Sequence, residues 1–173
     1  MKILVQLVIM FLIYMQHGIT QNINTVIKTE ALKMAKALAE LDLDTYASFS
    51  YPTLVEDKAS KEKIKQGVDS VEKYRQQFGI KVKSILIGNP SDVLTYKGIM
   101  QCTIPQKLTI EAFMRTMTSE STLIGLSKDG KTWYFVDALL YKRTETKSKL
   151  PELSPKLVIP PMKPPTIIQN NPN

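Results

Sequence analysis

The spacing of the apolar residues changes once along the chain, near residue 80, and this change limits the folds that are available. From Ile27 to Phe78 apolar residues recur every three or four positions, which is the spacing of one face of a helix. From Ile80 to Tyr141 they largely alternate with polar residues, which is the spacing of a strand with one buried face. Helices followed by strands is the order of an α+β domain.

The helical half predicts three helices. Asn24 is placed to cap the first, and Asp44 to cap a short second helix. The second helix must end before Pro52, because the residue before a proline avoids the α region. The third is predicted to begin at Ser60, as its N-cap, and to stop at Gly79. Its apolar stripe, which predicts packing on an apolar surface, consists of Ile64, Val68, Val71, Tyr74 or Arg75, and Phe78.

The strand half predicts an antiparallel meander on which the helices pack. The sequence "NPSD" at 89–92 is typical of a turn, and Pro105-Gln106 is predicted to end a strand. Asp129-Gly130 is predicted to form a two-residue type I′ hairpin turn, which needs positive φ at both positions. The fold prediction is therefore α+β, with N-terminal helices on a curved antiparallel sheet of four to six strands. The predicted strands cover 80–88, 93–104, 107–118, 121–127 and 132–141.

The first twenty residues have the layout of a secretory signal peptide. Lys2 precedes an apolar run over residues 3–14, and the small residues Gly18 and Thr20 favour cleavage before Gln21. The run has about 12 apolar residues, fewer than the roughly 20 that span a bilayer, although an uncleaved anchor is the alternative. We expect a secreted or periplasmic protein with one α+β domain over residues 21–145.

A proline-rich tail follows over residues 146–173. Seven of the ten prolines lie between Pro151 and Pro172. Because proline lacks the backbone donor and fixes φ, we expect this tail to be extended or disordered and not to add a strand to the sheet. Apolar residues such as Val158 leave a second interpretation open, in which the tail docks on a partner or folds back over the domain.

The residue inventory excludes several kinds of chemistry. The only histidine, His17, lies in the predicted signal peptide, and the only cysteine is Cys102. Catalysis by Ser-His-Asp or Cys-His is therefore not expected, nor is a metal site or a cofactor. Cys102 has no partner for an intrachain disulfide and no position suited to a lipid anchor, and its alternating run predicts a buried, inert thiol.

The charge pattern limits the class of partner. The formal net charge is +7, but the lysines are spread among acidic and hydroxyl residues and form no basic block with interleaved aromatics. We therefore expect no nucleic acid. The expected partners are an unknown small molecule or an envelope protein, with a homodimer through the sheet as a further possibility. Membrane contact is expected only through an uncleaved signal sequence.

Several linked segments resemble the NTF2-like (cystatin-like α+β) superfamily. These are "AKALAELDLDTYASFSYPTLVE", "SKEKIKQGVDSVEKYRQQFG" and the closing "SKDGKTWYFVDA". The resemblance covers roughly Ile27 to Leu140 and implies a cone with a pocket between the helices and the sheet. Members include isomerases, dehydratases, hydrolases and proteins that only bind. The mature chain lacks the histidine of the dehydratases, and Asp42 and Asp44 are placed at helix ends, so the resemblance implies a fold and not an activity.

One carboxylate is a candidate catalytic group. Asp137 shares a strand face with Trp133 and Phe135, although a position at the strand end, bonding to backbone, is the alternative.

A non-catalytic binding or interaction module is the favoured function, and an isomerase or hydrolase using a buried carboxylate is the alternative. The predicted pocket-lining residues, for which plain core packing is the alternative, are Tyr46, Tyr51, Tyr74, Tyr96, Met100, Met114 and Trp133.

Overall fold

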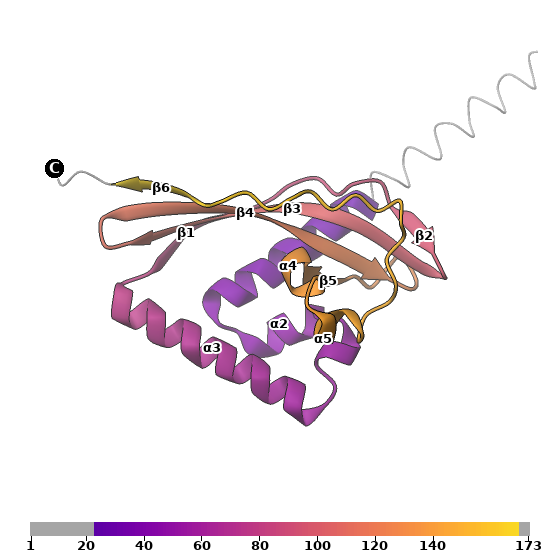
Figure 1. Ribbon diagram of the computed structural model, residues 1–173, viewed down its shortest axis with the longest axis horizontal. Helices are drawn as coiled ribbons and strands as arrows, with labels where there is room; N and C mark the ends of the chain where they lie inside the picture. The colour runs from indigo at the N-terminus through magenta and orange to yellow at the C-terminus, as the bar shows by residue number, and fades with distance from the viewer. Residues whose placement is uncertain (1–22, 170–173) are drawn as a thin grey trace, which may run out of the picture.

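The computed structural model describes residues 23–169 and shows an α+β fold. The helices come first and lie on one side of an antiparallel, curved and unclosed six-stranded sheet (Figure 1). The helical part comprises a first helix over residues 23–40, α2 (Leu43–Phe49), the 3-10 turn η1 (Pro52–Leu54) and α3 (Lys58–Phe78). The strands are β1 (Lys81–Ile87), β2 (Leu94–Tyr96), β3 (Ile99–Ala112), β4 (Arg115–Ser127), β5 (Tyr134–Asp137) and β6 (Thr166–Gln169), with the short helices α4 (Ala138–Tyr141) and α5 (Thr144–Lys147) between the last two.

The helix caps differ from the prediction at three positions. Residue 23 is already helical, so Asn24 does not cap the first helix. Asp42 caps α2 in place of Asp44, and Asp57 caps α3 in place of Ser60. In both cases the carboxylate accepts the backbone N–H and the hydroxyl of the residue three positions on, which satisfies a donor that the helix leaves free. Gly79 ends α3 in the left-handed region, as predicted.

The long hairpin of β3 and β4 forms the centre of the sheet, whose order is β1-β3-β4-β5. β2 pairs with β3 beyond the end of β1, and β6 pairs with β4 beyond the end of β5. The prediction that Pro105 ends a strand was wrong, because it lies inside β3 opposite Thr122. Its carbonyl accepts a 2.8 Å hydrogen bond from Gly88, just past the end of β1, so its missing donor interrupts no regular ladder there.

Two tight turns lie inside runs that were predicted as single strands. Lys97 and Gly98 have φ of 48° and 76°, and Phe113 and Met114 have φ of 43° and 56°. Positive φ at both central residues is the signature of a type I′ turn, so these pairs form the two-residue hairpins. They divide the predicted runs 93–104 and 107–118.

The predicted type I′ turn at Asp129-Gly130 is absent. Residues 128–133 form a longer loop between β4 and β5, in which Gly130 alone has positive φ. The Asp129 carboxylate accepts hydrogen bonds from the backbone of Lys131 and Thr132, both at 2.8 Å. These bonds lower the pKa of Asp129 to about 2. Asp129 thus has a structural role, as expected, but it acts through its side chain and not through the backbone conformation of a type I′ turn.

Two clusters of buried residues pack against the sheet. Side chains alternate between the faces of a strand, so Leu123 and Ile124 belong to different clusters. The first helix packs on the inner face, which carries Cys102, Ile104 and Phe135. Cys102 is fully buried, as predicted, and this burial raises the pKa of its thiol to about 12, which disfavours the reactive thiolate. The second cluster contains Tyr51, Ile124, Leu126, Val136 and Ala138, with residues of the C-terminal segment packed on it.

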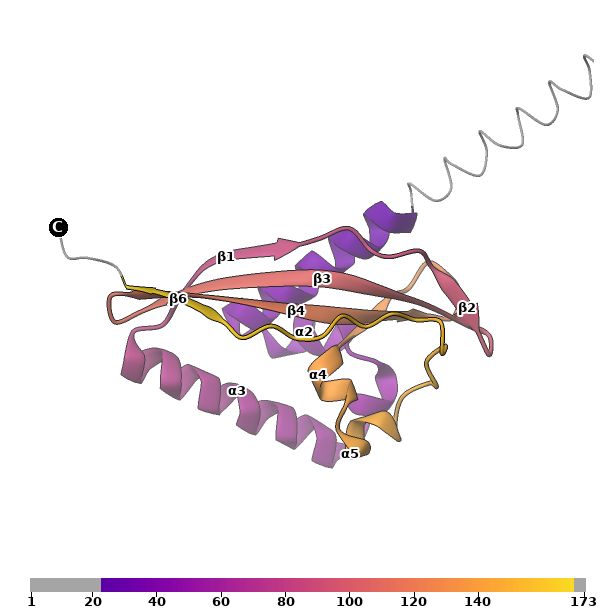
Figure 2. The same ribbon diagram turned by 45° about the horizontal axis from the view of Figure 1, so that its top comes forward.

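The C-terminal segment, residues 150–169, is part of the domain. The prediction that it would not add a strand was wrong, because Thr166–Gln169 pairs with Arg115–Thr118 of β4. These four residues lie between prolines, so each retains its donor. Both views show the segment running along the sheet (Figure 2). Leu150, Leu153, Leu157 and Ile159 pack against the second cluster.

A buried amide fixes this segment to the sheet. Gln101 of β3 is fully buried, and its Nε2 donates to the carbonyl of Glu152 at 2.9 Å. Its Oε1 accepts from the backbone N–H of Ser154 at 2.8 Å. A buried amide without partners would destabilise the fold, so the sheet requires the segment in this position. The Glu152 carboxylate also contacts Lys97 and the Tyr96 hydroxyl.

The predicted signal peptide lies outside the described residues. Among residues 23–169, no helix has both the length and the apolar content that a bilayer crossing requires.

Candidate functional site

An apolar groove lies between α3 and the inner face of the sheet, which is the face that the helices cover. Its volume is about 390 Å³, which falls within the range of small-molecule sites. α3 leaves part of its predicted stripe uncovered, since Val71 is 46% and Tyr74 58% exposed. The groove is bounded by the first helix, α2, α3 and the strands β1, β3, β4 and β5. Its apolar lining includes Met34, Leu38, Leu41, Val71, Ile80, Val82, Ile85, Leu108, Ile110, Leu123 and Phe135.

Five side chains with a polar group enter this lining: Tyr46, Tyr74, Arg75, Gln106 and Asp137. Arg75, on the last turn of α3, is half-buried and donates from Nη1 to the carbonyl of Ala39 at 2.9 Å. Gln106 donates to the Ser121 hydroxyl at 3.2 Å. Arg75 and Asp137 are the only charged residues that line the groove within the described chain, and they have opposite signs.

Asp137 ends β5 and begins α4. Its carboxylate accepts the backbone N–H of Leu139 at 2.7 Å, so it caps the short helix as the alternative interpretation of the sequence proposed. Phe135 and Asp137 both line the groove, in agreement with their predicted shared face. Burial raises the pKa of Tyr46, and the negative charge of Asp137 adds to this effect. Tyr46 therefore presents a protonated hydroxyl at neutral pH.

The structure brings together three of the residues predicted for a site, namely Tyr46, Tyr74 and Asp137. Tyr51 instead packs in the second cluster, edge-on to Tyr134 with ring centroids 5.7 Å apart. Trp133 is buried in the first cluster and donates from Nε1 to the Gly130 carbonyl at 3.2 Å.

The remaining three predicted residues also lie outside the groove lining. Met100 packs on the first cluster, close to Gly130. The hydroxyl of Tyr96, in β2, donates to the Glu152 carboxylate at 3.3 Å. Met114 is 53% exposed at the tip of the β3–β4 hairpin, because the turn that the sequence pattern concealed places it there.

The sequence prediction missed most of the groove lining. Leu108 and Ile110 lie in the run 107–118 that was predicted as a strand, and Arg75 was placed on the stripe of the third helix, but none was assigned to a site. Two sequence signals could have found them. One is the apolar face of the strand, and the other is the single arginine among the apolar residues of the third helix. Periodicity reports the face of each element and does not report the distance between α3 and the sheet.

A second cavity, of about 430 Å³, lies between the sheet, α4 and residues 159–163 of the C-terminal segment. Gln106 and Asp137 line both cavities. Glu120 holds the segment here, through Lys163 at 3.2 Å, and also lies 3.8 Å from Lys107. The second cavity is therefore bordered by paired charges.

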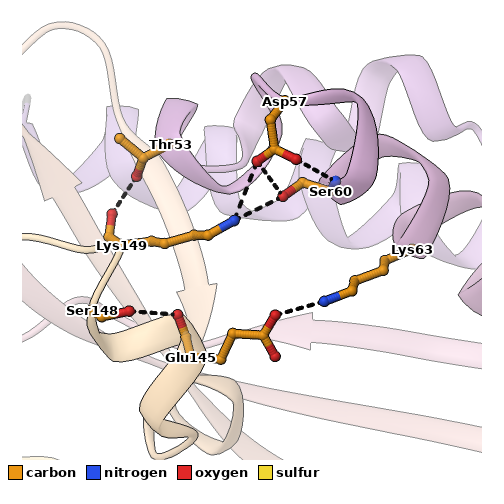
Figure 3. Close-up of polar contacts among 7 residues, drawn as sticks. All are labelled: Thr53, Asp57, Ser60, Lys63, Glu145, Ser148 and Lys149. Atoms are coloured by element: carbon orange, nitrogen blue, oxygen red, sulfur yellow. Dashed lines mark hydrogen bonds and ion pairs between the residues drawn. The ribbon is translucent and has the colours of Figure 1, made fainter.

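Polar contacts hold the N-terminal end of α3 (Figure 3). Lys149 Nζ lies 3.2 Å from Asp57 Oδ2 and 3.0 Å from the Ser60 hydroxyl. Lys63 pairs with Glu145 of α5 at 2.6 Å. The hydrogen bonds from Ser60, with a further one from Lys149, hold the pKa of Asp57 well below its ordinary value. α3 is thus attached to α5 and the residues after it by exposed charges.

No protein-family model, curated protein or solved structure matches this chain. Residues 23–169 also contain no group of three or more His, Cys, Asp or Glu side chains placed to hold a metal ion.

Proposed function

We propose that this protein is an NTF2-like, non-catalytic binding module that holds a small, largely apolar molecule in the groove beneath α3. The observation that carries the proposal is the groove itself, an open apolar hollow of about 390 Å³ with five polar-group side chains on its wall. Concave, mostly apolar sites with a few polar groups are the common form of small-molecule sites. The helices-first α+β order supports the NTF2-like assignment.

The hydrogen bonding of the Asp137 carboxylate favours a binding function over a catalytic one. One of its carboxylate oxygens already accepts the N–H that begins α4, and the groove is predominantly apolar. A general base must be free to take a proton from the substrate. The second candidate, an isomerase or hydrolase that uses Asp137, rests on the nearby protonated Tyr46 hydroxyl, which is suited to donate to a developing oxyanion.

The groove assignment is tested with Nile red, a neutral fluorescent probe for apolar sites. Leu108→Gln should weaken probe binding about fivefold or more, because it places an amide in the apolar wall. Leu86→Gln is the matched control, since Leu86 lies on neighbouring β1, is 59% exposed and lines only the second cavity. Weaker binding in the Leu86 variant alone would move the site to the second cavity. Unchanged binding in both variants would refute the groove assignment.

The two candidate functions differ in their response to Asp137→Asn. Small molecules that co-purify with the protein from its native host can be identified by mass spectrometry and added back. A binding module returns them unchanged, whereas an enzyme converts them and loses that conversion in the variant.

We also propose that the protein is secreted or periplasmic. The support is the predicted signal peptide, with Gly18 and Thr20 before Gln21. Intact-mass measurement of protein from the native host should give an N-terminus at Gln21, and a chain that still carries Met1 would refute the proposal.

A further inference from the structure

Arg75 is the one cation on the groove wall among the described residues. It projects from the last turn of α3 and is half-buried, whereas most of the lysines lie on the exposed surface. Its Nη1 atom donates to the carbonyl of Ala39, near the end of the first helix. A cation at a helix C-terminus is favourable, so this contact explains part of its placement.

The rest of the guanidinium is not explained by the fold. The ion pairs among residues 23–169 all involve lysines, and none includes Arg75. A guanidinium carries five N–H donors in a rigid fork, and the structure accounts for the Nη1 contact alone. A partly buried charge without an opposite charge lowers stability, and an anion bound beside it would reverse this effect.

The neighbours of Arg75 determine what kind of anion fits. Val71, Tyr74 and Ile80 line the groove at the end of α3, and Leu108 and Ile110 of β3 line it from the sheet. A compact hydrophilic anion would leave these side chains without contacts. A ligand with an apolar chain and one planar anionic end would satisfy both features, because a carboxylate accepts two parallel hydrogen bonds from an arginine fork.

We infer that the groove binds a single-chain carboxylic acid, with its alkyl chain along the apolar wall and its carboxylate on Arg75. This inference rests on the proposed function and specifies its ligand class. It requires the groove to prefer an acid to a neutral molecule of the same length, and it assigns that preference to Arg75.

The experiment compares dodecanoate with dodecanol as competitors of Nile red at neutral pH. The full-length mature protein should bind dodecanoate about tenfold more tightly than dodecanol, as expected for a charge-assisted hydrogen bond at a partly exposed site. Arg75→Gln should remove this preference and leave dodecanol affinity unchanged. Arg75→Lys, which keeps the charge beside the first helix but loses the fork, should retain part of it.

Arg143→Gln is the matched control, because it removes an exposed arginine that lines neither cavity. It should keep the full preference for the acid. Melting temperatures of all variants separate loss of the Ala39 contact from loss of ligand recognition, because a purely structural role of Arg75 would not change the ratio of the two affinities. If Arg75→Gln does not fold, the wild-type ratio and the Arg75→Lys variant still provide the test.

The possible outcomes separate this inference from the proposed function. Equal affinity for the acid and the alcohol, or a preference that survives in Arg75→Gln, would overturn the assignment to Arg75 and leave the groove as a neutral apolar site. Failure of both ligands to displace Nile red, with no effect of Leu108→Gln, would overturn the groove itself.

Discussion

Asp57 makes the stability of the fold depend on pH, through contacts with residues far apart in the sequence. Its depressed pKa comes from the Ser60 hydroxyl and backbone, and then from Lys149, which lies ninety-two positions later in the chain. A carboxylate whose pKa is lower in the folded than in the unfolded state stabilises the fold above its ordinary pKa of 3.8. That contribution is lost as the pH falls through this value toward the folded pKa.

Asp57→Asn should therefore lower stability by a constant amount from about pH 7 to about pH 5, with the difference shrinking below about pH 4. Urea unfolding of both proteins across this range provides the measurement. A difference that is as large in acid as at neutral pH would show that Asp57 acts through the geometry of its cap and not through its charge.

The turns were the least predictable feature at the residue scale. Lys97-Gly98 and Phe113-Met114 both adopt positive φ, although neither pair has the usual Asn-Gly or Asp-Gly sequence. Bulky residues rarely adopt positive φ, so the sequence pattern predicts that the strand continues across Phe113-Met114. Two interactions offset the local strain. β3 pairs with β4 along the hairpin, and the ring of Phe113 packs edge-on against that of Phe78, with ring centroids 5.7 Å apart.

At the scale of elements, the C-terminal segment should be needed for stability only in its first part. Truncation after Lys149 removes both hydrogen-bond partners of the Gln101 amide, at about 0.5–1.5 kcal/mol for each bond, and uncovers the second cluster. Together with the lost burial of leucine side chains, we expect a loss of at least about 3 kcal/mol in the free energy of unfolding.

Truncation after Pro160 is the matched control for this prediction. It removes β6, whose side chains are all exposed, but keeps every contact of Gln101. We expect its free energy of unfolding to stay within about 1 kcal/mol of the full chain, since exposed residues contribute little. Equal losses in the two truncated proteins, measured in urea, would contradict the role given to the buried amide.

The period of apolar residues predicted most elements but not their connections. The change of spacing near residue 80 correctly placed helices before strands, and Gly79 correctly marked the end of α3. The cap of α3 was misplaced because Ser60 and Asp57 interact with each other, and either alone resembles a cap. β6 was missed because prolines on both sides of it concealed a four-residue strand.

At the scale of the whole molecule, the candidate site was predictable only in part. Asp137 was recognised from its strand face, and Tyr46 and Tyr74 from their residue type. The groove itself arises because α3 crosses the sheet at a distance, held at one end by Asp57 and Lys63 and at the other by Arg75. A sequence pattern records no such distance, so the role of Arg75 became visible only in three dimensions.

The weak attachment of α3 has a consequence for amide hydrogen exchange. Its partly exposed stripe and its exposed ion pairs give it a lower free energy of local opening than the central strands. We expect the amides of α3 to exchange with deuterium well before those of β3 at neutral pH. A molecule bound in the groove contacts both α3 and the sheet, so it should slow exchange in α3 selectively and leave the slow rates of β3 unchanged. Exchange followed by mass spectrometry would then report occupancy of the groove even when the chemical identity of its ligand is unknown.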